Sequence, residues 1–242
     1  MCKTMLVVVL YDKTYKDSLT LNCLMNKEYT EADLLIINVG PKSLEFDKEF
    51  IHTLGFFVSD IYIKEVLDGA PIGDVYNSIV KESNDYERFI ILDDDCKLSK
   101  GYLKKLDIYR TNDIDLQIPH ISDRNHSEIH YPVINESVPM SNDGLIVNQY
   151  DRVKTIGVGL VIYRSLITKF RSLEMDVFSS DFKLHDVDSD FFDRLNLLKN
   201  KKIATGIQIA GTMGCLSSQK NDTYNKLSSV KRIYNRVLGV RN

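Results

Sequence analysis

Short apolar runs alternate with amphipathic stretches along the first half of the chain. The runs Met5–Tyr11, Asp33–Val39 and Arg88–Leu92 are continuous and rich in branched aliphatic residues, which is typical of strands buried on both faces. Apolar residues recur at helical spacing in Asp17–Glu28 and in Pro71–Ser83. Strands and helices that alternate in this way predict βαβ units, an α/β fold and a mostly parallel sheet.

The second half of the chain is less regular. Its pattern predicts strands at Thr155–Tyr163 and Ile203–Ala210 and a helix at Asp186–Lys199. In the first half, Phe56–Ile63 is predicted as one further strand. The stretch Asp123–Asp151 has few apolar repeats and many polar residues, so we expect a long loop that serves as a lid or a binding segment. Neither an internal repeat nor a linker interrupts the chain, and we predict one domain over residues 1–242.

Charge is distributed unevenly over the chain. Hydrophobic residues make up 43%, charged residues make up 27%, and the net charge is −3, so a nucleic-acid partner is not expected. Residues 217–242 contain six basic residues and one acidic residue, whereas the rest of the chain carries a net charge of −8. We predict a basic C-terminal helical tail that binds a partner or an anionic membrane surface; a solvated helix explains the pattern equally well.

The cysteine pattern and the apolar runs bear on location. The four cysteines stand far apart without a CxxC pair, which favours a reducing compartment over a disulfide scaffold or a zinc ribbon. No apolar run reaches 18 residues, and the apolar stretch near the N-terminus is too short for a signal peptide. These features predict a cytoplasmic protein.

Three consecutive acids, Asp93-Asp94-Asp95, follow a predicted buried strand. Carboxylates packed together at a strand end repel one another and are partly desolvated, unless a cation neutralises them. Ligands of open α/β sheets gather at the carboxyl ends of the strands, so Asp12 and Asn38 should converge with the acidic run. Mn²⁺ and Mg²⁺ suit this site because they bind one or two carboxylates and complete their shell with phosphate oxygens and water.

The alternation of an extended segment separates the three acids. Asp93 and Asp95 can share one ligand-facing side, whereas Asp94 would point toward the ribose of a nucleotide or toward a supporting hydrogen-bond donor. The competing interpretation is a polar loop whose acids cap a helix that begins near Ser99.

Several segments together resemble the bacterial inverting glycosyltransferases of family 2, which have the GT-A fold, a Rossmann-like three-layer sandwich. The resemblance covers most of residues 4–240, and its last segment is similar to the rhamnosyltransferase-like branch. The segments that carry it are, in chain order, VVVLYDKTYKDSLTLNCL, IINVGPKS, YNSIVKESNDYERFIILDDDCKLSKGYL, GVGLVIYRSLI, HDVDSDFFDRL and SSVKRIYNRVL.

The resemblance implies a site and a reaction. Asp93 and Asp95 would form the metal-binding Asp-x-Asp pair for Mn²⁺ or Mg²⁺. The nucleotide-sugar, of UDP, dTDP or GDP type, would lie near Tyr11, Asp12, Asn38, Asn77 and Asp94. An acceptor hydroxyl would attack the anomeric carbon, with Asp186 as general base and Asp188 as the alternate. A helix N-cap role for Asp186 is compatible with this assignment.

The implied acceptor is a lipid-linked or surface-polysaccharide glycan at the inner face of the cell membrane, where the basic tail would make peripheral contact. The chain also departs from the family pattern. His185 stands where the family has an acid, Asp12 stands for a usual Asn, and Gly211-Thr212-Met213-Gly214 lacks the histidine of a His-x-x-Gly motif. A further contact to the metal or the diphosphate is therefore in doubt.

Three histidines, His120, His126 and His130, lie in one segment. A zinc site would need regular spacing or a nearby cysteine, so we expect a polar lid that touches the acceptor instead.

Three other functions compete with glycosyl transfer. A phosphatase of the haloacid dehalogenase type also has Asp-x-Asp after an apolar strand, but normally close to the N-terminus, and here 92 residues precede the motif. A nucleotidyltransferase needs a glycine-rich loop after its first strand, and DKTYKDS contains no glycine. A nucleotide-sugar-binding module without turnover is the alternative from a different functional class, and the absent histidine favours it.

Overall fold

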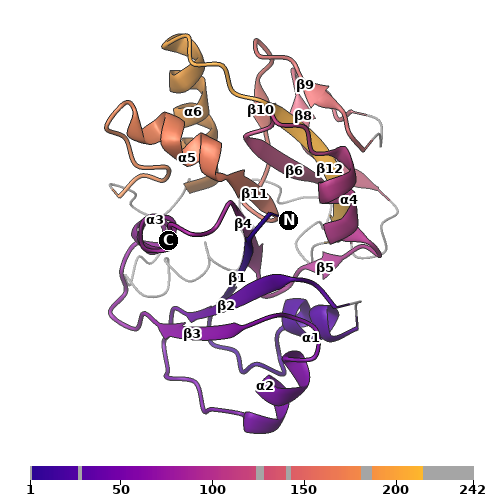
Figure 1. Ribbon diagram of the computed structural model, residues 1–242, viewed down its shortest axis with the longest axis vertical. Helices are drawn as coiled ribbons and strands as arrows, with labels where there is room; N and C mark the ends of the chain where they lie inside the picture. The colour runs from indigo at the N-terminus through magenta and orange to yellow at the C-terminus, as the bar shows by residue number, and fades with distance from the viewer. Residues whose placement is uncertain (1, 27–28, 124–127, 140–142, 181–186, 215–242) are drawn as a thin grey trace, which may run out of the picture.

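The structure is a computed structural model that describes residues 2–26, 29–123, 128–139, 143–180 and 187–214. The described residues form a ten-stranded sheet (Figure 1). The main path of this sheet runs in the order β3 (Ile61–Glu65), β2 (Ala32–Asn38), β1 (Thr4–Leu10), β4 (Arg88–Asp93), β11 (Leu160–Tyr163), β6 (Leu116–Ser122), β12 (Ile207–Gly214) and β5 (Lys97–Leu98).

Four short strands complete the β structure of the described residues. β7 (Ile129–Tyr131) pairs with β6 and β9 (Ile146–Val147) pairs with β12, while β8 (Val133–Ile134) and β10 (Val153–Lys154) form a separate two-stranded sheet. The main sheet is mostly parallel. β3, β2, β1 and β4 run in one direction, β11 is antiparallel to both β4 and β6, and β12 is parallel to β6. The carboxyl ends of β1, β2, β4, β6 and β12 therefore lie at one edge.

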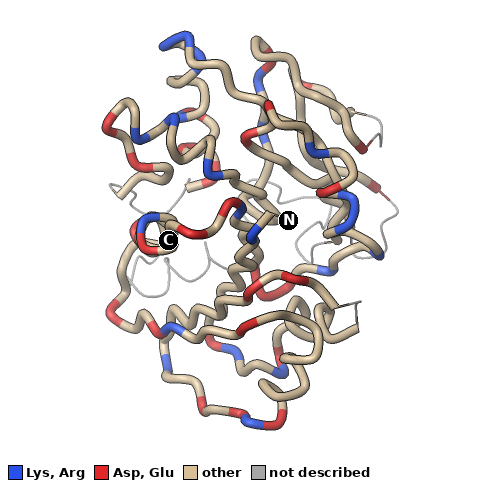
Figure 2. Tube along the Cα trace, viewed as in Figure 1, with Lys and Arg blue, Asp and Glu red and all other residues tan. Residues whose placement is uncertain are grey.

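Helices pack on both faces of the sheet and make three layers. The apolar residues of α3 (Ile72–Glu82), α5 (Arg164–Arg171) and α6 (Val187–Asn200) form one core with one sheet face. Those of α1 (Leu19–Met25), α2 (Lys48–Leu54) and α4 (Tyr102–Tyr109) form a second core with the opposite face. Every residue of β1, β2 and β4 is buried, which agrees with their continuous apolar sequences. Figure 2 shows acidic and basic residues interspersed over this framework.

The predicted fold class is confirmed, whereas several element boundaries are wrong. The segment predicted as a strand from Phe56 begins as a turn, because the backbone N–H groups of Phe56 and Phe57 donate to carbonyls at the end of α2, so β3 starts only at Ile61. β11 is confined to Leu160–Tyr163, since Gly159 has a positive φ of 73° that breaks the extended chain.

The last predicted strand is displaced toward the C-terminus. β12 covers Ile207–Gly214 and has an irregularity between Ile209 and Thr212. The pattern also missed α2, α5 and β6, and both of these helices have at most eight residues. A helix close to α4 was expected only in the competing interpretation of the acidic run, which begins it near Ser99. Within the part of the chain that the structure describes, every helix is too short or too polar to span a lipid bilayer. The predicted tail, residues 217–242, lies outside the described residues.

Candidate functional site

The acidic run ends β4 at the carboxyl edge of the sheet, where the sequence predicts it. In the parallel registers, Val9 of β1 stands beside Asp93 and Leu10 stands beside Asn38, so the three strand ends are adjacent. Asp93, Asp94 and Asp95 are 4%, 1% and 6% exposed. Three carboxylates this deeply buried are costly unless they are neutralised or hydrogen-bonded.

The start of α1 holds the backbone of the acidic turn. The N–H of Thr20 and the hydroxyl of Ser18 both donate to the carbonyl oxygen of Asp94, at 3.1 and 3.2 Å. The hydroxyl of Thr20 donates to the carbonyl oxygen of Asp93 and accepts from the N–H of Cys96 at 2.9 Å. These bonds fix the turn, and with it the position of each carboxylate, against the loop that follows β1.

Asp94 has a partner that the sequence analysis did not identify. The Lys13 ammonium lies 2.6 Å from Asp94 Oδ1, and the Lys13 side chain is 31% exposed. Asp94 is therefore bound to a cationic side chain of the protein, and Lys13 is its supporting hydrogen-bond donor. Lys13 also places a positive charge beside the acidic turn. In the sequence, Lys13 belongs to no recognised motif and stands in the polar loop DKTYK, so nothing marks it as the partner of Asp94.

The carboxylate of Asp93 lies in an unfavourable electrostatic environment. Burial raises its pKa well above the usual value, the carboxylates of Asp95, Asp188 and Asp94 raise it further, and Lys13 opposes them. Its Oδ2 atom is buried without a hydrogen-bond partner. A buried oxygen of this kind, among like charges, is what a hard divalent cation would relieve, so the pair Asp93 and Asp95 fits Mn²⁺ or Mg²⁺.

The described residues do not provide a complete metal cage. They contain no group of three or more His, Cys, Asp or Glu side chains that could hold a metal ion together. Mg²⁺ and Mn²⁺ sites in phosphate-handling proteins commonly use one or two carboxylates, with phosphate oxygens and water as the other ligands. The two-carboxylate arrangement is of that type.

Asp188, in the first turn of α6, lies close to this acidic turn. Its charge acts on Asp93 and on the hydroxyl of Tyr76. Its carboxylate also packs against Gly157, where an added Cβ would come within 1.9 Å of Asp188 Oδ1. Asp186, the predicted base, lies outside the described residues. The fold thus places Asp188 near Asp93, although the two residues are far apart in the sequence.

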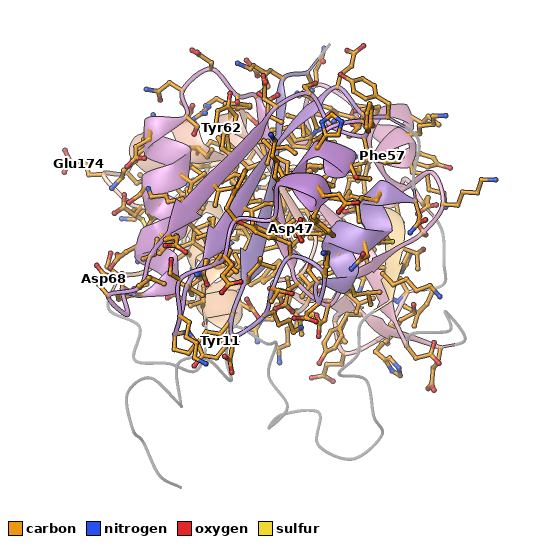
Figure 3. The ribbon with its side chains drawn as sticks, turned by 90° about the horizontal axis from the view of Figure 1, so that it is seen from below. Tyr11, Asp47, Phe57, Tyr62, Asp68 and Glu174 are labelled. Carbon is orange, nitrogen blue, oxygen red and sulfur yellow. The ribbon has the colours of Figure 1, made fainter. Side chains whose placement is uncertain are left out.

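The residues predicted near the nucleotide lie in the loops after β1 and β2. Tyr11 is half-buried and lies toward the end of the strands opposite Tyr62 in Figure 3. Asp12 has a φ of 50°, and its N–H donates to the carbonyl oxygen of Gly40 at 2.8 Å, which ties the two loops together. Asn38 is buried; its amide donates to the Lys42 carbonyl at 2.7 Å, and its oxygen accepts from the N–H of Gly40.

Asn77 lies within α3 and is also buried. Its amide donates to the carbonyl oxygen of Phe178 at 2.7 Å, and its side-chain oxygen accepts from the N–H of Phe178 at 3.0 Å. This paired contact joins α3 to the segment that precedes α6. It gives Asn77 a structural role, and a nucleotide contact for Asn77 stays a prediction.

The histidines predicted to form a polar lid do not all lie in a loop. His120 belongs to β6 and is fully buried, so it is part of the sheet and not of a loop. Neither of its ring nitrogens has a hydrogen-bond partner, and burial lowers its pKa. His130 lies in β7, and His126 lies outside the described residues. The structure therefore corrects the prediction that His120 belongs to a polar lid.

Comparison with known proteins bears on the fold. No family model and no curated protein matches the sequence. Among solved structures, TarS of S. aureus superposes with a TM-score of 0.57 at 16% identity, over 89% of this chain and 37% of TarS. GalNAc-T7, solved with UDP, GalNAc and Mn²⁺, superposes with a TM-score of 0.56 at 12% identity, over 99% of this chain and 48% of that chain.

A shorter TarS structure, residues 1–349 in complex with UDP, gives a TM-score of 0.55 at 16% identity, over 90% of this chain and 58% of that chain. The chain spans between about a third and three fifths of the length of these structures. At such identities the likeness concerns the fold alone. The chain shares the α/β fold of these structures, and the predicted GT-A type of fold is confirmed.

Proposed function

We propose that the chain is a metal-dependent inverting glycosyltransferase that moves a sugar from a nucleotide-diphosphate donor to a hydroxyl group of a glycan or lipid-linked acceptor. The observation that carries the proposal is the buried pair Asp93 and Asp95 at the carboxyl end of β4, in a chain with a GT-A-like fold. The unpartnered oxygen of Asp93 supports a bound Mn²⁺ or Mg²⁺ at this pair.

The donor would occupy the edge formed by the ends of β1, β2 and β4. Asp93 and Asp95 would hold the cation, which when bound supplies Lewis-acid stabilisation of the leaving diphosphate. Tyr11, Asp12 and Asn38 border the same edge and would contact the nucleoside. Similar structures were solved with UDP, with UDP-GlcNAc, and with UDP and Mn²⁺, so UDP-sugars are the first donors to test.

The protein must also remove a proton from the acceptor. In our proposal Asp186 takes the hydroxyl proton as the new bond to the anomeric carbon forms and the bond to the diphosphate breaks on the opposite face. Asp188 is the alternate base. Its position beside Asp93 and Gly157 gives it access to the same edge.

Donor binding can be tested by thermal shift with UDP-, GDP- and dTDP-sugars, each with and without Mn²⁺. We expect at least one donor to raise the melting temperature only when the metal is present, as linkage requires for a ligand of the folded state. Asp93→Asn should remove the metal-dependent part, whereas Asp60→Asn, an exposed acid on another loop, should leave it unchanged. If no donor stabilises the protein with Mn²⁺, the proposal fails.

Turnover separates an enzyme from a binding module without activity. Slow release of nucleotide diphosphate from the stabilising donor, followed by NMR, would show turnover, and the anomeric configuration of the transferred sugar would distinguish inversion from retention. Asp186→Asn should lower transfer by about 10²–10⁴-fold, the contribution usual for a general base, while donor binding persists. Near-normal transfer in folded Asp186→Asn would move the role of base to Asp188.

The acceptor proposal rests on the basic segment 217–242 and predicts peripheral contact with anionic membranes on the cytoplasmic side. Removal of the residues after Ser217 should weaken sedimentation with vesicles that contain phosphatidylserine. Unchanged sedimentation would discard the membrane contact and leave the donor chemistry standing.

A further inference from the structure

A groove with a volume of about 520 Å³ opens on the sheet face that α3 covers. Met5 of β1 and Leu35 of β2 line its apolar floor. The edge strand β3 and the end of α3 form its two sides. Volumes of 300–1,000 Å³ are usual for small-molecule sites, and an apolar floor with a few polar groups is their usual lining.

The groove is separate from the acidic turn. It includes Tyr86, which precedes β4, whereas Asp93 ends β4. The five steps from Arg88 to Asp93 amount to roughly 17 Å at about 3.3 Å per residue. Figure 3 shows the same separation, with Tyr62 of the groove and Tyr11 of the donor edge toward opposite ends of the strands.

Two tyrosines give the groove an aromatic side. Tyr62 projects from β3 and is 47% exposed, and it stands directly beside Leu35 in the parallel register. Tyr86 is buried, and its hydroxyl donates to Asp33 at 2.5 Å and interacts with the hydroxyl of Tyr62. Burial and the neighbouring Asp33 raise the pKa of Tyr86, so its hydroxyl stays protonated and can donate to Asp33. The exposed ring of Tyr62 therefore lies beside a buried, hydrogen-bonded tyrosine.

Polar groups surround this aromatic side. Lys64 of β3 and Glu82 of α3 form an ion pair at 3.4 Å that links the two sides of the groove. Asn84 and Asp85 also line it and are exposed. Their side chains provide an amide and a carboxylate that can bond the hydroxyl groups of a ligand.

We propose that this groove is a second glycan-binding site, remote from the reaction, that takes a short neutral oligosaccharide. A pyranose ring presents an apolar face of C–H groups, which suits the exposed face of Tyr62, and a rim of hydroxyl groups, which suits Asn84, Asp85 and Glu82. A phosphate or a nucleotide fits poorly, because the groove has two carboxylates and one ammonium group, and that ammonium is paired.

The role of this site rests on the proposed function. A growing glycan held at the groove would raise the local concentration of its reactive end at the donor edge, as two linked binding sites do. Binding at the groove itself needs neither donor nor turnover.

The test is an NMR titration of the full isotope-labelled chain with three neutral disaccharides, maltose, cellobiose and diacetylchitobiose, at millimolar concentration. We expect at least one to shift resonances of the groove, and Tyr62→Ala to weaken that binding by about ten-fold. The matched control is Tyr150→Ala, which removes a tyrosine that is 93% exposed and does not line the groove. The inference is overturned if no disaccharide shifts groove resonances, or if Tyr62→Ala binds as well as the native chain.

A second measurement separates this inference from the proposed function. If transfer occurs, Tyr62→Ala should raise KM for a long acceptor severalfold and leave KM for the donor and for a monosaccharide acceptor unchanged. Disaccharide binding without any donor binding would support the groove and defeat the proposed transferase. Groove shifts caused by an extended peptide but by no disaccharide would instead identify β3, the edge strand of the described sheet, as a peptide site and overturn the glycan assignment.

Discussion

The carboxylate of Asp188 packs against the α-carbon of Gly157, so closely that a Cβ at Gly157 would come within 1.9 Å of Asp188 Oδ1. Gly157 lies in the segment before β11, and Asp188 lies in the first turn of α6. The absent side chain at Gly157 therefore gives Asp188 the room to stand beside Asp93. This relationship connects a glycine to the electrostatics of the acidic turn.

Gly157→Ala should move the Asp188 carboxylate and leave the fold intact, because the clashing atoms are the end of a side chain that can rotate. We expect transfer to fall by ten-fold or more, with a change of about 1 kcal/mol or less in the free energy of unfolding. Steady-state kinetics and urea denaturation would measure the two effects. Gly55→Ala is the matched control, since Gly55 has an ordinary helical φ of −63°. Unchanged kinetics in Gly157→Ala would show that the position of Asp188 does not matter to the reaction.

Asp93→Asn should stabilise the protein when a chelator is present. The folded-state pKa of Asp93 is raised, so at neutral pH the buried carboxylate lowers stability, and this penalty fades as the pH falls through the raised pKa. We expect the variant to melt roughly 2–4 °C higher at pH 7, the shift that about 1 kcal/mol produces in a domain of this size, and the difference to shrink toward pH 5. Calorimetry with EDTA at both pH values would measure it. A variant that melts lower at pH 7 would mean that Asp93 is stabilised by a group outside the described residues.

The sequence predicted the parts of the fold and of the site that depend on local pattern. The buried strands β1, β2 and β4 are continuous apolar runs, and the acidic turn follows directly from one of them. The rule that parallel strands end at one edge of a sheet was enough to predict that the ends of these strands lie together. The registers of β1 with β2 and β4, which place Leu10 beside Asn38 and Val9 beside Asp93, confirm this prediction.

The features that the sequence did not reveal depend on contacts between distant residues. Lys13 and Asp94 are 81 positions apart, and only the folded loop after β1 brings them together. The same holds for the contact between Asn77 and Phe178, in which the Asn77 amide donates to a backbone carbonyl 101 positions away, while the nucleotide contact implied by the resemblance stays a prediction. His120 was predicted to lie in a polar lid because its segment LQIPHIS contains polar residues, whereas every residue of this segment is buried in β6.

His120 gives the protein a sensitivity to acid that opposes the effect of Asp93. Its folded-state pKa lies below the usual value of 6.5 because of burial, an effect that the nearby Lys105 increases and Asp143 opposes. The unfolded chain therefore binds a proton more readily, and stability should fall as the pH drops through about 6.5. His120→Leu should remove this component. The difference in unfolding free energy between the two proteins, measured in urea at pH 7.5 and at pH 5.5, isolates it from other groups; an equal difference at both values would contradict the assignment.

Lys13 should matter more to stability than its partial exposure suggests, because it is paired with a carboxylate that is only 1% exposed. Lys13→Met would leave the buried carboxylate of Asp94 without its ion-pair partner. We expect the free energy of unfolding to fall by about 1–3 kcal/mol, below the 3–5 kcal/mol of a fully buried pair because water reaches the lysine. Lys16→Met is the matched control: Lys16 pairs with Asp47 but is 67% exposed, so its loss should cost much less stability than the loss of Lys13. A double-mutant cycle with Asp94→Asn tests the pairing itself, because Lys13→Met should cost much less stability when Asp94 is already neutral. Equal costs in both backgrounds would show that Lys13 acts on another group.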